Sequence, residues 1–302
     1  RDPEMSRGLG DVYKRQIYGL VGLKTHSKIA LVVRREEDGI KRYVHLGTGN
    51  YNDQTAKLYT DMGLLTCSDP IGEDATAVFN MLSGYSEPRK WNKLAVAPIW
   101  LKDKFLMLIN REAENARQGK KARIIAKMNS LCDPKVMEAL YDASAAGVKI
   151  DLIVRGICCI KAGVPGLSEN ISVRSIVGNF LEHSRIFYFY NDGFEDIYMG
   201  SADWMPRNLD KRVEITFPVE DPDLKKRIKD ILKIQLADTL KAHIMQPDGS
   251  YEKQDLRGKV KLDSQMYFAE EARKRSAKPE DADAAISHDR VFIPIEAEES
   301  EH

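Results

Sequence analysis

The 302-residue chain lacks several features that would place it in a specialised class. Its 46 Lys and Arg residues balance its 46 Asp and Glu residues, so no net charge draws it to nucleic acid or to a membrane surface. No apolar run approaches the roughly 18 residues that a membrane-spanning helix needs, and no secretory signal peptide is evident. The cysteines show no C-x-x-C spacing, which argues against a disulfide framework or a zinc site and favours a reducing cytoplasm with bystander thiols; they are Cys67, Cys132, Cys158 and Cys159.

What the chain does contain is the composition of two ordinary folded domains, with 43% hydrophobic and 30% charged residues. Proline and charges at 86–90 interrupt the apolar pattern, so we place the domains at 17–93 and 94–272. Residues 1–16 have no period and resemble translated vector or adapter sequence, so we set them aside as a non-native leader and expect the first domain to be partial. The charged segment 273–302 is expected to be a disordered tail, with disorder starting near Glu270.

Short β-type segments alternate with amphipathic helices along most of the chain, which predicts the α/β fold class. Capping and glycine signals help to set the helix ends, such as Asp133 before Pro134 and Gly147 after the helix. The predicted helices are Glu73–Ser83, Lys104–Gln118, Asp133–Ala146 and Asp223–Lys241. The predicted strands are Ile17–Leu23, Lys28–Val33, Arg42–Leu46, Ala122–Lys127, Val148–Val154, Ile171–Ile176, Arg185–Tyr190 and Ile197–Met199.

One motif occurs twice. A His-Ser-basic tripeptide at 26–28 is followed by a strand, a turn, a strand and the segment Gly-Thr-Gly-Asn at 47–50. The same order recurs with His-Ser-Arg at 183–185 and Gly-Ser-Ala-Asp at 200–203. The two histidines are one domain length apart (183 − 26 = 157), so we expect two related half-domains that each donate one imidazole to a shared site.

The motif suits phosphate chemistry. Small residues let backbone amides approach an anion closely, and the Thr48 and Ser201 hydroxyls add donors. We expect the side chain of Asn50 or Asp203 to bond the opposite histidine and fix its tautomer. His45, next to the glycine segment, is either a wall of the site or a packing residue.

These strings resemble the phospholipase D superfamily and, more specifically, the C-terminal catalytic half of the larger, histidine-dependent polyphosphate kinases, from about Ile17 to Ala272. Two departures from the phospholipase D pattern favour the kinase: Val33 stands where that pattern has Asp, and Arg185 replaces the second Lys. The resemblance implies two phospholipase D-like α/β/α half-domains related by a pseudo-twofold repeat, the first incomplete. The segments that carry it are Leu23–Lys28, Tyr43–Asn52, Leu58–Asp61, Leu181–Arg185 and Ser201–Asn208.

The resemblance also implies residue roles. His26 would be the nucleophile that becomes phosphohistidine, and His183 would contact the nucleotide phosphates and act as acid or base. Tyr59 and Arg155 would contact ATP, and Lys28 and Arg185 would stabilise phosphate charge. Arg207 and Asn208 are weaker candidates for contact with the polyanion.

The implied partners are ATP, ADP and inorganic polyphosphate, with no nucleic acid and no transmembrane segment, and a homo-oligomer is expected for the full-length enzyme. The implied cofactor is Mg²⁺, with no metal ligand in this chain because the family's positions would lie upstream of Ile17. The expected location is cytoplasmic, with peripheral membrane association left open. Two alternatives stay open: a phospholipase D-type phosphodiesterase or phosphatidyltransferase, and an inactive polyanion-binding fragment.

Overall fold

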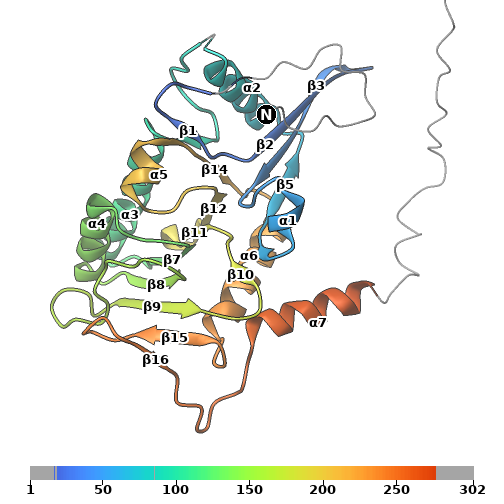
Figure 1. The fold of residues 1–302 in the computed structure, drawn as a ribbon. Coiled ribbons are helices and arrows are strands. Elements are labelled where there is room, and N and C mark those ends of the chain that lie inside the picture. Colours follow the sequence, from blue (N-terminus) through green and yellow to red (C-terminus); the bar gives the residue numbers. More distant parts are fainter. Residues whose placement is uncertain (1–16, 18, 85, 277–302) are drawn as a thin grey trace, which may run out of the picture.

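The computed structural model describes residues 17, 19–84 and 86–276, so the predicted leader 1–16 and the tail from 277 onward lie outside the described residues. A nine-stranded mixed sheet occupies the second half of the chain (Figure 1). Its strands β7, β8 and β9 run parallel, and a helical crossover joins β7 to β8. In spatial order its strands are β16 (Tyr251–Lys253), β15 (Ala242–Met245), β9 (Ile171–Ile176), β8 (Lys149–Val154), β7 (Arg123–Met128), β11 (Ile186–Phe189), β12 (Asp196–Gly200), β14 (Ile215–Pro218) and β6 (Ala95–Val96).

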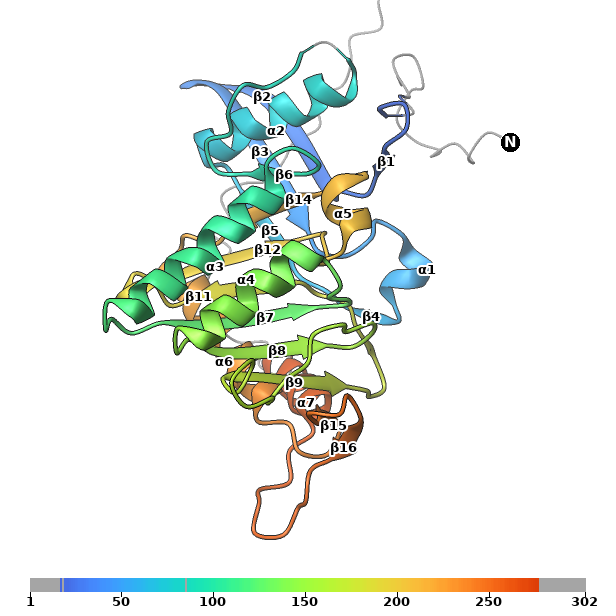
Figure 2. The same ribbon diagram turned by 90° about the vertical axis from the view of Figure 1, so that its left-hand side faces the viewer.

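Helices cover both faces of this sheet. Figure 2 shows α3 (Leu101–Arg117) and α4 (Pro134–Ala145) side by side across the strands, with α6 (Pro222–Leu236) behind them. The face under α3 and α4 buries Phe105, Phe187 and Trp204, whose rings lie within 5.5 Å of one another by centroid. None of the helices among the described residues combines the length and apolarity that crossing a membrane requires.

The first half is smaller in the part of the chain that the structure describes. Its sheet has the order β2 (Ile29–Glu36), β3 (Gly39–Gly47), β5 (Gly63–Thr66), and the turn at 37–38 joins β2 to β3 as the Asp-Gly signal predicted. Helix α2 (Asp69–Leu82) covers one face, where its Ala75 and Val78 pack in one core cluster with Val44 and Leu46. Among the described residues, the full α/β/α layering is therefore present in the second half only.

Two short parallel strand pairs join the halves. β1 (Lys24–Thr25) pairs with β13 (Arg212–Val213), and β4 (Tyr59–Thr60) pairs with β10 (Leu181–Glu182). Each pair takes one strand from each half, so the repeat in the sequence becomes a pseudo-twofold arrangement in space. The remaining elements are α1 (Asp53–Ala56), a 3₁₀ turn at Asn191–Gly193, α5 (Pro206–Asp210) and α7 (Ser264–Ser276).

The α/β class and most predicted elements are confirmed, and three predictions are wrong. Residues 19–23 form a turn rather than a strand, because Gly19 and Gly22 adopt φ of 85° and 81°. The helix predicted to reach Lys241 ends at Leu236, and the buried Asp238 side chain then accepts the amides of Lys241 and Ala242, which turns the chain into β15. Residues 270–276 are helical because α7 is anchored at its start by buried Ser264 and Gln265. All four cysteines are free, two exposed and two half-buried.

The cap of α6 gives a test of how local signals support this fold. The Asp221 side chain accepts the amides of Asp223 and Leu224, both at 2.9 Å, at the start of the helix. Replacing it by Ala should lower the free energy of unfolding by about 1 kcal/mol, because those amides lose their acceptor. Asp221→Asn retains a capping oxygen and should lose only a small part of that amount. Urea denaturation measures both, and equal losses would contradict the capping explanation.

Candidate functional site

The two interhalf strand pairs deliver the histidines to one place. His26 follows β1 and Glu214 follows β13, and His26 Nδ1 lies 2.9 Å from both carboxylate oxygens of Glu214. His183 follows β10 and Asp61 follows β4, and His183 Nδ1 lies 2.9 and 2.8 Å from the Asp61 oxygens. The histidine of each half is therefore held by a carboxylate from the other half. The expected shared site is thus present as two crossed histidine–carboxylate pairs.

The same symmetry extends to the glycine segments. Thr48 Oγ1 donates to Asp61 at 2.8 Å, and Ser201 Oγ donates to Glu214 at 2.5 Å. Each hydroxyl oxygen also accepts the amide that follows the carboxylate residue, from Met62 at 3.0 Å and from Ile215 at 3.1 Å. The hydroxyls thus orient the carboxylates that orient the histidines. We predicted that these hydroxyls donate to phosphate, whereas in the structure they donate to the carboxylates that hold the imidazoles.

The expectation that Asn50 or Asp203 would bond the opposite histidine is wrong for Asp203. Its carboxylate instead pairs with Arg185, at 3.2 Å from Nε, and accepts the Asn129 amide at 2.8 Å. The histidine partners were missed although the sequence holds a signal for them. An acid stands 14 residues after the first glycine of each motif, Asp61 after Gly47 (61 − 47 = 14) and Glu214 after Gly200 (214 − 200 = 14).

The geometry gives the imidazoles one tautomer. A neutral ring that donates Nδ1–H to a carboxylate keeps the lone pair on Nε2. For His183, Arg185 Nη1 lies 3.1 Å from Nε2, and Tyr59 stacks on the ring with centroids 4.6 Å apart. Burial lowers the pKa of His183, Arg185 and Arg155 lower it further, and Asp61 opposes them. His183 is therefore a neutral, enclosed imidazole near pH 7.

The predicted cations gather around the same two rings. Lys28 is 7% exposed and its ammonium donates to the His26 carbonyl, just as Arg185 donates to the His183 carbonyl at 2.9 Å. Burial lowers the pKa of Lys28 to about 8, against the opposing effects of Glu214 and Asp61. The site can therefore bind an anion with charges that are already desolvated.

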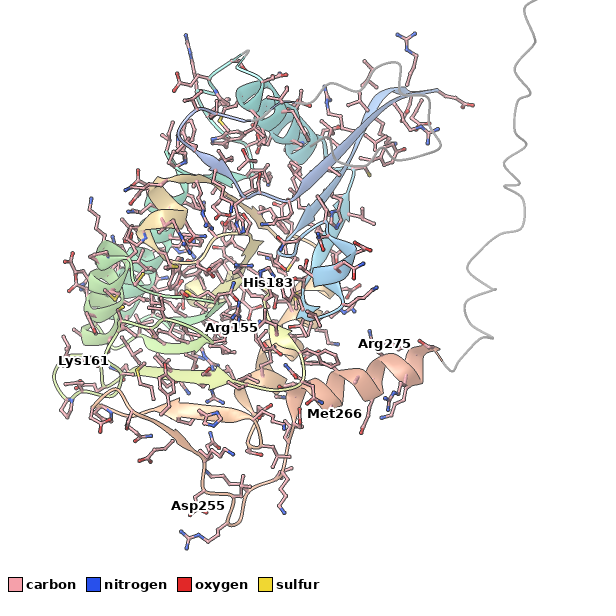
Figure 3. The ribbon with its side chains drawn as sticks, in the orientation of Figure 1. Arg155, Lys161, His183, Asp255, Met266 and Arg275 are labelled. Carbon is pink, nitrogen blue, oxygen red and sulfur yellow. The ribbon has the colours of Figure 1, made fainter. Side chains whose placement is uncertain are left out.

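Arg155 lies at the end of β8, beside His183 in Figure 3, and is half-buried. Its Nε donates to Asn129 at 2.8 Å, which leaves the rest of the guanidinium free to meet a phosphate. Burial lowers its pKa, and the neighbouring Arg185 lowers it further. All six predicted site residues (His26, Lys28, Tyr59, Arg155, His183 and Arg185) thus lie around the two crossed pairs.

Two of the weaker candidates have other contacts. Asn208 is 1% exposed and donates to Glu214 at 2.7 Å, so it supports the partner of His26. His45 bonds the Tyr51 hydroxyl at 2.6 Å and packs against the glycine segment.

Within the described residues no group of three His, Cys, Asp or Glu side chains could hold a metal ion. The nearby carboxylates are already committed to His26, His183 and Arg185, so this site does not fit Mg²⁺ ligation.

Fold and site together define an α/β protein in which two half-domains share one bis-histidine centre flanked by buried cations. Residues 94–265 match the family described as "Polyphosphate kinase C-terminal domain 2", and residues 4–88 match "Polyphosphate kinase C-terminal domain 1". The chain belongs to the polyphosphate kinase family. The second match begins inside the segment set aside as a leader, whose origin stays a prediction.

Individual relatives agree with this assignment. The chain is 58% identical over 235 residues to a polyphosphate kinase of Synechocystis, which covers 78% of this chain and 32% of the relative. It is 51% identical over 286 residues to that of Lactiplantibacillus plantarum, covering 94% and 40%. The crystal structure of the Porphyromonas gingivalis polyphosphate kinase superposes with a TM-score of 0.80 at 38% identity, over 85% of this chain and 40% of that one. The chain thus spans about a third to two fifths of these relatives.

The crossed pairing predicts which histidine each acid controls. Glu214→Ala should release the His26 ring into a mixture of tautomers, because Nδ1–H loses its acceptor, and should leave His183 unchanged. Asp61→Ala should do the reverse. Nitrogen-15 NMR of the imidazoles separates the tautomers, and each variant is the control of the other. An equal response of both rings to either substitution would refute the crossed arrangement.

The buried ammonium of Lys28 should make the free energy of unfolding depend on pH. Its pKa falls from 10.5 to about 8 on folding, so the unfolded chain binds the extra proton between these values. The free-energy cost of burying the charged Lys28 ammonium is complete below pH 8, and it disappears as the pH rises toward 10.5. Lys28→Met should therefore raise the free energy of unfolding by roughly 3 kcal/mol more at pH 7 than at pH 10.5.

Urea titrations at the two pH values measure this difference. Lys57→Met, at an exposed lysine of the same half, is the matched control for loss of one positive charge. A gain for Lys28→Met that is equal at both pH values would show that the ammonium carries no burial penalty.

Proposed function

We propose that this chain forms the catalytic centre of an ATP:polyphosphate phosphotransferase that works through a phosphohistidine on His26. The observation that carries the proposal is the Glu214–His26 pair, in which Nδ1 is occupied at 2.9 Å and Nε2 keeps its lone pair. The His26 side chain is 20% exposed, so the imidazole is open to solvent on part of its surface. His183 is enclosed by Tyr59 and Arg185, which makes it the supporting imidazole.

The reaction has two displacements at phosphorus. Nε2 of His26 attacks the γ-phosphorus of ATP, and the bond to the β–γ bridging oxygen breaks so that ADP leaves with the electron pair. A terminal oxygen of polyphosphate then attacks the phosphohistidine, and the P–N bond breaks so that the imidazole recovers its lone pair. The Nδ1 proton stays in the hydrogen bond to Glu214 throughout. Run backward, the same steps make ATP from polyphosphate.

The surrounding cations match the charge that each displacement develops. The transferred group spreads negative charge over its equatorial oxygens, and Lys28, Arg155 and Arg185 would stabilise it. Arg155 and Arg185 suit phosphate because a guanidinium can donate two parallel hydrogen bonds. His183, with Tyr59 stacked on it, would contact the nucleotide phosphates and exchange a proton with the leaving or entering oxygen.

Substrates and setting follow the same proposal. The partners are ATP, ADP and inorganic polyphosphate, acting in the cytoplasm, and the full-length enzyme is a homo-oligomer. Mg²⁺ would neutralise the phosphates of the nucleotide, with protein ligands from the part of the relatives that lies outside this chain. No step above depends on a metal ligand from the described residues.

Labelling with γ-³²P ATP tests the nucleophile. We expect acid-labile, base-stable label on the protein, and none on His26→Ala, because the attacking nitrogen is gone. His45→Gln, a histidine of the same half outside the crossed pairs, is the matched control and should keep the label. His183→Gln leaves His26 in place to accept the phosphate, but it should slow labelling by about 10²- to 10⁴-fold because the supporting imidazole is lost.

The assay uses the chain alone and the same sequence within an intact polyphosphate kinase. Label that survives His26→Ala would overturn the assignment of the nucleophile. Turnover of phosphodiesters without nucleotide would support the phospholipase D-type alternative instead. Tight polyphosphate binding with no label in either form would identify a polyanion-binding protein.

A further inference from the structure

One buried ammonium holds the residues on both sides of His183. Nζ of Lys127 donates to the carbonyl oxygen of Ser184 at 3.1 Å and to its hydroxyl at 2.7 Å. The same nitrogen lies 3.1 Å from Oε2 of Glu182. Because residues 182 and 184 flank His183, the backbone that carries the imidazole is fixed before and after the ring.

This ion pair is almost wholly buried. Lys127 is 1% exposed and Glu182 is 5% exposed, so both charges are removed from solvent. Two buried charges are tolerated only when their partners are close and well oriented, and an unpaired charge there is strongly unfavourable. The geometry of the pair is therefore restricted to a narrow range, and that restriction passes to its neighbour His183.

Glu182 also collects donors from other elements. Thr60 Oγ1 of β4 lies 3.2 Å from Oε2, and Gln235 Nε2 of α6 lies 2.9 Å from the same oxygen. Thr60 stands between Tyr59 and Asp61, the two residues that hold the His183 ring. One carboxylate thus fixes both the strand before His183 and the strand that presents its ring partners.

The remaining donor comes from the C-terminal helix. Gln265 Nε2 of α7 donates to Glu182 Oε1 at 2.8 Å and to the Phe180 carbonyl at 2.7 Å, and its Oε1 accepts the Phe180 amide at 2.9 Å. A Cβ at Gly178 would collide with this amide, so the fit is close. The neighbouring Ser264 anchors α7 differently, by donating to Asp238 at 2.7 Å.

We propose that Lys127, Glu182 and Gln265 are positioning residues for His183, so that docking of α7 sets the orientation of the imidazole. They act through the backbone of residues 180–184 and through Thr60. The kinetic part of this inference rests on the proposed function, whereas the state of the ring can be measured whether or not the chain transfers phosphate.

Gln265→Ala and Ser264→Ala form a matched pair for the test. Both remove a neutral, buried anchor of α7, and only Gln265 touches Glu182. The readout is the NMR titration of the His183 ring, which faces Asp61, Arg185, Arg155 and Tyr59. Gln265→Ala should move the His183 pKa upward toward 6.5, because a loosened ring gains water, while Ser264→Ala should leave it at the wild-type value.

Kinetics give the second readout. In the intact enzyme, Gln265→Ala should lower kcat by roughly 10- to 100-fold, since small misplacements of a catalytic group are costly, and Ser264→Ala should stay within about threefold of wild type. If Gln265→Ala lowers Tm as much as Ser264→Ala does and leaves the His183 titration unchanged, Gln265 is structural only and the proposal is overturned. If Gln265→Ala shifts the His183 titration but His26 of the intact enzyme takes no label from ATP, the positioning proposal stands and only the proposed function is contradicted.

A double variant tests the ion pair without leaving a lone buried charge. Lys127→Met with Glu182→Gln removes both charges and keeps the side-chain volumes, so it should fold. It should move the His183 titration in the same direction as Gln265→Ala, because Ser184 loses its ammonium donor. A double variant that titrates like wild type would show that the pair does not position the ring.

Discussion

The site depends on the crossed contact between a histidine of one half and a carboxylate of the other. His26 and His183 take Glu214 and Asp61 from across the pseudo-twofold axis, and two-residue parallel strand pairs bring them together. Backbone bonds repeat this plan, since the His26 amide donates to Val213 and the His183 amide to Thr60. Packing of the two halves, rather than either half alone, therefore creates the tautomer that each imidazole needs.

The centre also concentrates buried charge. Lys28, Lys127 and Arg185 are each at most 7% exposed, and each faces carboxylates that are themselves mostly buried. Such groups lose hydration on folding and regain only part of it from one another. Desolvated cations would interact more strongly with a phosphate group than hydrated ones do, which is what the proposed function requires of this centre.

Periodicity and turn chemistry predicted most of the fold, and the repeat predicted the site. The alternation of apolar residues placed β7, β8 and β9, and the repeated His-x-basic motif identified both histidines. Two errors came from tertiary or backbone effects: the turn after α6 that buried Asp238 holds by accepting the Lys241 and Ala242 amides, and the positive φ of Gly19 and Gly22. Asp61 and Glu214 were missed because a hydrogen bond between residues 122 or 188 positions apart leaves no local pattern.

The repeated motif differs in length between the two halves in the segment from histidine to glycine, and the crossed histidine–carboxylate pairs explain why the difference falls there. The segment from histidine to glycine is four residues longer in the first half, 21 (47 − 26) against 17 (200 − 183), and forms the longer β2–β3 hairpin. From glycine to acid both halves keep 14 residues. A hairpin can lengthen outward into solvent without moving its ends, whereas one added residue before the acid would displace the other half's imidazole. Insertions and loop grafts in this chain therefore belong at the hairpin tip near residues 37–38, and the segment after each glycine has a fixed length.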